Sequence, residues 1–454
     1  MTRTALLRRI ALVPAAVLAG AAACNDLLQV DNPNNVNVEA LSNPASAPNQ
    51  VNGELAALTR GANELVGLVV TASDELTWTG SLDGMDRLNR GFVRDPTIEF
   101  VIDATTAMSQ ARYMAARTVA QLEQFKAANQ LTDPTQLALA NLYAAVTYDY
   151  LANHFDDFVI ASAEREAGAP IGSAKMVTLY DSAEAAATRG LALLPATSAT
   201  ALVRGQLTAM RARAKFDRAI WQKLNPSGKA PADPLVSDQG AADDAVAALT
   251  IFAGTTGGAD ARLPLTVTTG MAIGNCFLPS CTNSRKEIAF NPALGSYNYT
   301  TRALTVALRD PITNQPDPVL QSLMQEFVTG NLLTTLIATG ARDMRLIAAE
   351  VALAKGNTTE FATQINALRA LNNLPAWTGA AGQPSARDIL IHERRVNLFL
   401  QGRRLNDMYR FGIVDPAWSA QGETLTCPGA ELPIGDIERQ TNPNMPSTQP
   451  ACGS

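Results

Sequence analysis

Residues 389–412 read ILIHERRVNLFLQGRRLNDMYRFG and carry the most specific pattern in this 454-residue chain. Ile389, His392 and Val396 recur at helical spacing and share one face of a helix that we predict over residues 385–401. The segment HERRV lacks the second histidine of the HExxH zinc motif. We therefore interpret His392 as a histidine at the edge of the core.

On both sides of this stretch, Ala and Leu at helical spacing predict a mostly α-helical protein. Asp133-Pro134 is a typical helix start, and Gly356-Asn357 and Asn372-Asn373 are predicted helix ends because these residue types tolerate left-handed backbone. The predicted helices cover residues 104–129, 134–153, 177–194, 201–223, 241–252, 342–355, 359–372 and 385–401. Their arrival two by two favours about four tetratricopeptide-like hairpins, and a helical bundle without repeat geometry is the alternative.

Three long stretches without helical period interrupt the helices, at residues 77–99, 252–315 and 373–384. Loops of this length in an ordered domain commonly carry function, so we expect the ligand site there. Flat aromatic side chains suit the C–H patches of sugars, and the candidates are Trp78, Tyr297, Tyr299, Trp377 and Trp418. Alternation places Tyr297 and Tyr299 on one side of an extended segment. For each residue, packing onto the helices is the competing interpretation.

The amino terminus has the three parts of a signal peptide. Arg3, Arg8 and Arg9 precede an uncharged run over residues 10–23 that ends in small residues, and Cys24 follows directly. That run is shorter than the roughly twenty residues that a spanning helix needs. We predict a signal peptide over residues 1–23, a lipidated Cys24 with a flexible tether over residues 24–50, and a single domain over residues 51–454. Ordinary cleavage after Ala23, leaving an unmodified cysteine, is the alternative.

Four further cysteines remain, an even number in an exported chain. We expect one disulfide between Cys276 and Cys281, whose spacing suits a small clipped loop, and another between Cys427 and Cys452. Paired C-x-x-C spacing is absent, and the two histidines lack partners at ligand spacing, so no metal and no cofactor is expected.

The composition argues for a globular binding protein. A formal net charge of −6 without a basic cluster argues against nucleic acid. No nucleophile elbow or phosphate loop is present, and we interpret Asp156-Asp157 as a turn because adjacent side chains point apart. We therefore predict that the protein is not an enzyme. Contact with the membrane is expected through Cys24 alone.

Three segments together resemble the RagB/SusD family of nutrient-binding outer-membrane lipoproteins. Residues 24–36 (CNDLLQVDNPNNV) resemble the family's lipidated start, and residues 431–445 (ELPIGDIERQTNPNM) resemble its closing turn. Residues 389–412 resemble its Glu-Arg-Arg helix and Arg-x-x-Asp-x-x-Arg segment, with Gln401 where an acid is common. YLANHFDDFVI, residues 150–160, is a weaker echo of a Phe-Gly-Asp turn, with Asp156 in place of glycine.

The resemblance implies a SusD-like fold, a surface-exposed lipid anchor in the outer membrane, and a TonB-dependent, SusC-like transporter as partner. The function it implies is capture of an oligomeric nutrient, most readily a glycan; a peptide-capturing variant and a tetratricopeptide-type protein-binding scaffold are the alternatives. Within it, Glu393, Arg394, Arg403, Arg404 and Asp407 are expected to form a buried charge network that locks two helices. Ligand residues of the family vary with the substrate, so none is transferred to this chain.

Overall fold

The computed structural model describes residues 38–161, 167–269, 278–446, 448–449 and 451–453. The chain forms two compact units, Met1–Ala47 and Pro48–Ser454. In the first unit, α2 (Val38–Leu41) precedes a short 3-10 turn that the Asn43 side chain caps through the Ala45 amide at 3.0 Å. Helix α3 begins at Ala47, so the end of the predicted tether, residues 47–50, is already helical. Cys24 lies outside the described residues.

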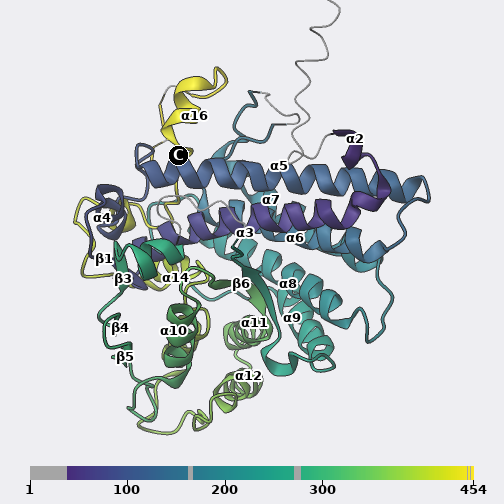
Figure 1. Ribbon diagram of the computed structural model, residues 1–454. Helices are drawn as coiled ribbons and strands as arrows, with labels where there is room; N and C mark the ends of the chain where they lie inside the picture. The colour runs from purple at the N-terminus through teal and green to yellow at the C-terminus, as the bar shows by residue number, and fades with distance from the viewer. Residues whose placement is uncertain (1–37, 162–166, 270–277, 447, 450, 454) are drawn as a thin grey trace, which may run out of the picture. The chain divides into compact units, whose positions relative to one another are not determined.

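The second unit is mostly helical, as predicted (Figure 1). The long helices are α3 (Ala47–Ala72), α5 (Glu99–Ala127), α6 (Pro134–His154), α7 (Val177–Ala192), α8 (Ala201–Leu224), α9 (Gln239–Phe252), α10 (Pro318–Gly330), α11 (Ala341–Ala354), α12 (Thr358–Ala370) and α13 (Ala386–Asn397). Shorter helices are α4 (Asp83–Asn89), α14 (Arg404–Phe411), α15 (Glu423–Thr426) and α16 (Asp436–Thr441), with 3-10 turns η2 (Ser173–Lys175) and η3 (Gly258–Asp260). All eight predicted helices are present, with ends displaced by a few residues.

Local capping explains why these helices begin and end where they do. Asp133 accepts a hydrogen bond from the Thr135 amide at 2.9 Å and starts α6, and Ser385 accepts one from the Asp388 amide at 3.1 Å and starts α13. Gly356 and Asn373 have φ angles of 73° and 56°, in the left-handed region. Both predicted helix ends are therefore confirmed.

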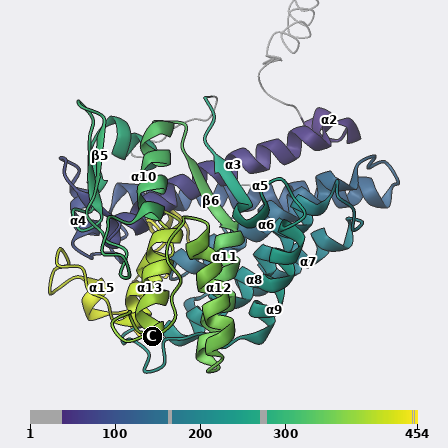
Figure 2. The ribbon, with the colours of Figure 1, turned by 90° about the horizontal axis from the view of Figure 1, so that it is seen from below.

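Consecutive helices pack against one another in order along the chain. Helices α5, α6, α7, α8 and α9 form successive contacting neighbours, and α11 contacts α9, α12 and α13. Figure 2 shows α11, α12 and α13 grouped together. Such hairpins bury their apolar faces only against their neighbours, and α6, in the middle of the stack, is buried along most of its length.

Helix α3 was not predicted, although it is among the longest in the protein. Its sequence contains Gly53, Gly61 and Gly67, residues that disfavour helix in isolation. Gly61 permits a close helix crossing, because a Cβ atom there would lie 3.3 Å from the backbone of Ala107 in α5. Burial of Leu58 and Leu65 on the same helix compensates for the weak propensity.

The stretches predicted as irregular contain short antiparallel ribbons. Strand β1 (Leu76–Trp78) pairs with β3 (Ile288–Phe290), and β4 (Gly295–Asn298) pairs with β5 (Ala303–Val306). Strand β2 (Arg262–Thr266) pairs with β6 (Thr335–Gly340) through a register shift at Leu263/Pro264. A single π-helical turn, η4 (Ser280–Ser284), lies between β2 and β3. These ribbons hold loops from distant parts of the sequence beside the helical stack.

Candidate functional site

The turn between α13 and α14 is held by buried ion pairs rather than arranged for chemistry. Arg394 Nε donates to Asp407 Oδ2 at 2.8 Å, and Arg410 Nη2 donates to Asp407 Oδ1 at 2.8 Å and to Glu350 Oε2 at 2.9 Å. Burial would raise the pKa of Asp407, but the two guanidinium groups outweigh it and hold that pKa at about 2. The carboxylate is therefore a fixed counter-charge and not a proton carrier.

The network is wider than the two helices that it was expected to lock. Arg404 makes a two-point contact with Asp74, at 2.7 and 2.9 Å, which ties α14 to the residues just after α3. Arg403 reaches Asp217 of α8 at 3.1 Å and Asp149 of α6 at 3.3 Å. Glu393 of α13 accepts a hydrogen bond from Arg369 of α12 at 2.8 Å, which ties these two helices together. The expected charged residues are thus confirmed as buried ion-pair partners, but their ion pairs form separate clusters, which join α13 to α12 and the start of α14 to α6 and α8.

His392 lies at the core edge, as predicted, and has carboxylate neighbours that sequence spacing did not reveal. Its Nε2 is 2.9 Å from Asp317 Oδ2. With Asp310, these two residues form a group of possible metal ligands, whose ligand atoms all lie within 4.8 Å of one another. Asp310, however, accepts from Arg369 at 2.8 Å, and Asp317 Oδ1 caps α10 through the amides of Val319 and Leu320. An ion pair and a helix cap account for these carboxylates without a metal ion.

Tyr297 and Tyr299, two of the predicted ligand residues, lie side by side at the end of β4. Their ring centroids are 4.8 Å apart in an edge-to-face arrangement, and both side chains are half-buried. The Tyr299 hydroxyl donates to the Thr282 carbonyl at 2.9 Å, and Lys286 Nζ lies 4.9 Å from the Tyr299 ring centroid. The expected alternation is therefore confirmed, and we call Tyr297, Tyr299 and Lys286 the tyrosine platform.

Trp78 occupies the last position of β1, opposite Ile288 of β3, and is half-buried. Its backbone amide donates to Asn89 Oδ1 at 3.1 Å, while its indole nitrogen is buried without a hydrogen-bond partner in the described part of the chain. No ring contact joins Trp78 to the tyrosine platform among the residues that the structure describes. The predicted aromatic residues are thus brought together only in part.

Trp377 does not have the exposure that its predicted ligand role requires. Its side chain is only 4% exposed, and it packs edge-to-face on Phe361 of α12 with ring centroids 5.1 Å apart. The indole nitrogen donates to the Pro384 carbonyl at 2.9 Å. Trp418 is similarly buried and donates to the Ala72 carbonyl at 2.8 Å. Both tryptophans belong to loops but are packed into the core, where each indole N–H donates to a backbone carbonyl.

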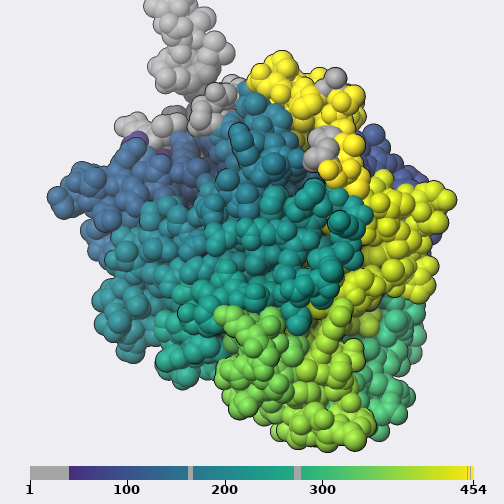
Figure 3. Space-filling model, turned by 180° about the vertical axis from the view of Figure 1, so that it is seen from behind, coloured from purple at the N-terminus to yellow at the C-terminus, as the bar shows by residue number. Residues whose placement is uncertain are grey.

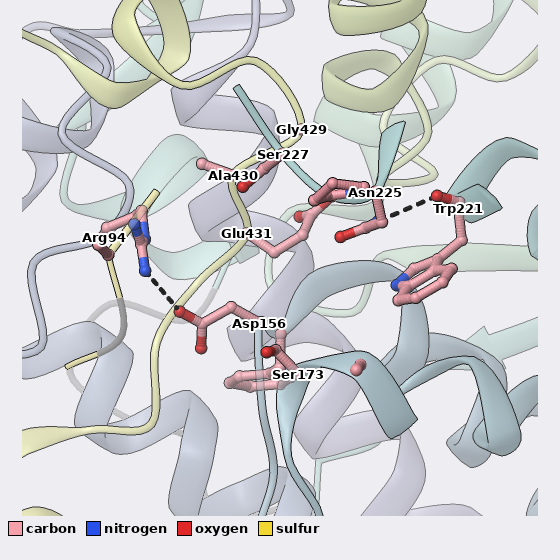
Figure 4. A pocket seen from close by; sticks show the side chains of 13 residues that line it. Arg94, Asp156, Ser173, Trp221, Asn225, Ser227, Gly429, Ala430 and Glu431 are labelled. Carbon is pink, nitrogen blue, oxygen red and sulfur yellow. Dashed lines mark hydrogen bonds and ion pairs between the residues drawn. The ribbon is translucent and has the colours of Figure 1, made fainter. Parts of the chain in front are cut away.

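A pocket of about 280 Å³ lies apart from these aromatic residues and is lined by six separate stretches of the chain (Figure 4). Arg94 and Asp156 form an ion pair at 3.4 Å on one side of it. The lining residues are Arg94, Phe155, Asp156, Ser173, Ala174, Trp221, Asn225, Pro226, Ser227, Gly429, Ala430, Glu431 and Ala451. We refer to it as the Trp221 pocket.

The predicted turn at Asp156-Asp157 is present, but its two acids have different roles. Asp157 Oδ1 accepts from the amides of Phe158 and Gly172 at 2.7 and 2.8 Å, as a turn residue does. Asp156 instead faces the Trp221 pocket. Because adjacent side chains point apart, the two residues do not act as an acid pair, but one of them lines a site that the sequence did not reveal.

The described cysteines agree with the expected disulfides where they can be compared. Cys427 and Cys452 are joined, with Cα atoms 6.0 Å apart. Cys276 lies outside the described residues, so its pairing with Cys281 stays a prediction. In the described part of the chain, no helix combines the length and the apolar character needed to cross a membrane.

Comparison with known proteins agrees with the resemblance of the sequence to the RagB/SusD family. Residues 342–445 match the model of the SusD family. No curated protein matches the chain in sequence. A SusD superfamily protein from Bacteroides fragilis has a similar structure, with a TM-score of 0.58 at 12% identity over 89% of this chain and 99% of that one.

Two Bacteroides vulgatus structures show the same similarity. A SusD superfamily protein has a TM-score of 0.54 at 15% identity, over 89% of this chain and 98% of its own. A proposed sugar-binding protein has a TM-score of 0.56 at 12% identity, over 88% of this chain and 97% of its own. The chain therefore has the same fold as these structures, and its residues 342–445 match the SusD family.

Proposed function

We propose that this protein is a surface lipoprotein that captures an oligosaccharide and passes it to a TonB-dependent outer-membrane transporter. The match of residues 342–445 to the SusD family supports a binding role rather than catalysis. The tyrosine platform is the observation that carries the choice of a glycan. One of the solved structures that resemble this chain is that of a proposed sugar-binding protein, which supports the same choice of ligand.

The tyrosine platform has the chemistry that a sugar chain needs. Two rings at right angles, with centroids 4.8 Å apart, offer a face and an edge to the C–H patches of neighbouring sugar units. Hydroxyl groups of the ligand would find the Lys286 ammonium nearby, 4.9 Å from the Tyr299 ring centroid. Tyr299 is fixed by its bond to the Thr282 carbonyl, so little side-chain entropy is lost on binding.

The test is a panel of oligosaccharides and peptides, titrated calorimetrically into the chain without its first 24 residues. We expect oligosaccharide binding, and a loss of at least about fivefold when Tyr297 and Tyr299 are both replaced by Ala, because aromatic contacts contribute roughly 0.5–1.5 kcal/mol each. Tyr113→Ala is the matched control, since Tyr113 is a half-buried tyrosine on α5. If only peptides bind, the protein is a peptide-capturing variant and the proposed glycan ligand is wrong. A protein that binds neither but retains a protein partner would instead be a scaffold.

We propose that Cys24 is lipidated and holds the domain at the outer surface of the outer membrane, with residues 1–23 removed. The Cys24→Ala variant should lose palmitate labelling and membrane association together. Survival of both in that variant would overturn the anchor. Recovery of a SusC-like transporter with the wild-type protein, and its loss from Cys24→Ala cells, would support delivery at the membrane.

A further inference from the structure

We propose that the Trp221 pocket is a second binding site, separate from the tyrosine platform, that holds a single neutral sugar ring. This inference rests on the proposed glycan-binding function and adds a place for one monosaccharide unit. The pocket is built where α6 and α8 end, between η2 and the carboxyl-terminal segment. Figure 3 shows the yellow carboxyl-terminal segment bordering the teal helical surface on one face of the protein.

The size of the pocket selects a small ligand. Its volume of about 280 Å³ is just below the range of roughly 300–1,000 Å³ that is typical of sites for drug-sized molecules. One pyranose ring fits this space, whereas several linked rings would extend beyond it. The ligand is therefore a monosaccharide or the terminal unit of a longer chain.

Trp221 provides the apolar wall. The residue belongs to the last turn of α8 and is half-buried, and Figure 4 shows its ring on the side of the pocket opposite the Arg94–Asp156 pair. An aromatic ring opposite a cluster of polar groups is a typical arrangement for binding a molecule with both C–H and O–H surfaces.

Polar atoms without good partners line the rest of the pocket. Asn225 Nδ2 donates to the Trp221 carbonyl at 3.0 Å, which leaves its side-chain oxygen as an acceptor. Asp156 Oδ1 is buried and accepts no hydrogen bond of good geometry, although the Gln449 amide lies nearby. Buried polar atoms are normally satisfied, so these oxygens suit hydroxyl groups of a ligand.

The balance of charge favours a neutral ligand. Burial raises the pKa of Glu431 well above its usual value, against the opposing effect of the Asn406 side chain, and so disfavours a negative charge on this side of the pocket. Burial also raises the pKa of Asp156, to about 6, against the opposing effect of Arg94 and Arg439. Near pH 7, Asp156 is ionised and paired with Arg94. A polyhydroxy molecule fits this environment better than an amine or a phosphate.

The Cys427–Cys452 disulfide fixes one wall of the pocket. Ser227 Oγ lies 3.4 Å from Cys427 Sγ and accepts a hydrogen bond from the Gly453 amide at 3.3 Å. The disulfide thereby holds Ala451, a lining residue, beside the turn that carries Asn225. The shape of the site therefore depends on the oxidised state of these two cysteines.

The test uses the methyl glycosides of glucose, galactose, mannose and xylose, with glucosamine and glucose 6-phosphate as charged counterparts. Saturation-transfer NMR and calorimetry on the chain without its first 24 residues should show at least one neutral glycoside binding more tightly than either charged sugar. Trp221→Ala should weaken that binding by about two- to tenfold. Ala174→Leu fills the exposed rim of the pocket without touching the core and should have the same effect.

The control separates this site from the tyrosine platform. The Tyr297→Ala/Tyr299→Ala double variant should keep monosaccharide binding at the wild-type level while it loses oligosaccharide binding. The second site is overturned if no glycoside binds, if a charged sugar binds best, or if Trp221→Ala and Ala174→Leu both bind as the wild type does. Loss of oligosaccharide binding in the double variant would still support the platform in each of these cases.

Discussion

Replacement of Arg410 by Met should be among the most destabilising single substitutions in this protein. The Arg410 side chain is buried and contacts two acids, Asp407 and Glu350, besides donating to the Pro234 carbonyl at 2.9 Å. Removing one partner of a buried ion pair costs about 3–5 kcal/mol, because the remaining charge stays buried. Arg394 lies 2.8 Å from Asp407 and 3.6 Å from Glu350 and offsets part of this cost. We therefore expect a loss of about 3 kcal/mol.

Urea unfolding followed by circular dichroism at neutral pH measures this loss. Arg218→Met is the matched control, because its ion pair with Asp181 is partly exposed and such pairs contribute only about 0.2–1 kcal/mol. Adding Glu350→Gln to Arg410→Met should restore part of the stability, since the unpaired carboxylate is removed while Arg394 still balances Asp407. If Arg410→Met unfolds within 1 kcal/mol or so of the control, the buried network does not stabilise the fold in this way.

Three further changes test other features of the structure. Burial lowers the pKa of His154 to about 3, with smaller effects from Arg403 and Arg213, so this histidine destabilises the fold as the pH falls below its unfolded pKa of about 6.5. In urea titrations, the stability of His154→Gln relative to the wild type should therefore rise by about 2–3 kcal/mol between pH 6.5 and 4.5. A constant difference in stability would contradict this. Cys452→Ser removes the disulfide with Cys427, which closes a loop with a sequence separation of 25 residues, and should lower the free energy of unfolding by about 3 kcal/mol. A reducing agent should cause the same loss of stability in the wild type but not in the variant. Gly402→Ala should lower the melting temperature, because φ is 73° and the added Cβ would lie 3.2 Å from His154 Nε2; an unchanged melting temperature would show that the turn relaxes.

The helical scaffold was predictable because its signals are local. A cap such as Ser385, a left-handed residue such as Gly356 and an apolar stripe all act within a few residues, so each can be read without knowledge of the fold. Helix α3 lacked such signals, because its glycines lower helix propensity and only packing against α5 explains Gly61. Tertiary packing there outweighs local preference.

The candidate sites were predictable only where neighbouring residues make them. Tyr297 and Tyr299 are two positions apart on one ribbon, so alternation was enough to place them together. Trp377 is in a loop, but its burial depends on Phe361, and no sequence pattern links a loop to the helix that covers it. The Trp221 pocket is lined by six separate stretches of the chain, and its residues have no common spacing. Its recognition required the tertiary structure.

The ion-pair network has a consequence for how the chain completes its folding. Asp74 has its cationic partners at Arg395 and Arg404, more than three hundred residues later in the sequence. A nascent or truncated chain that ends before these arginines would have to bury an unneutralised carboxylate, which is too costly to be stable. The amino-terminal half therefore reaches its final packing at Asp74 only after residues 395–404 have been synthesised. The ion pairs thus make the end of α3 depend on a segment from the last quarter of the chain.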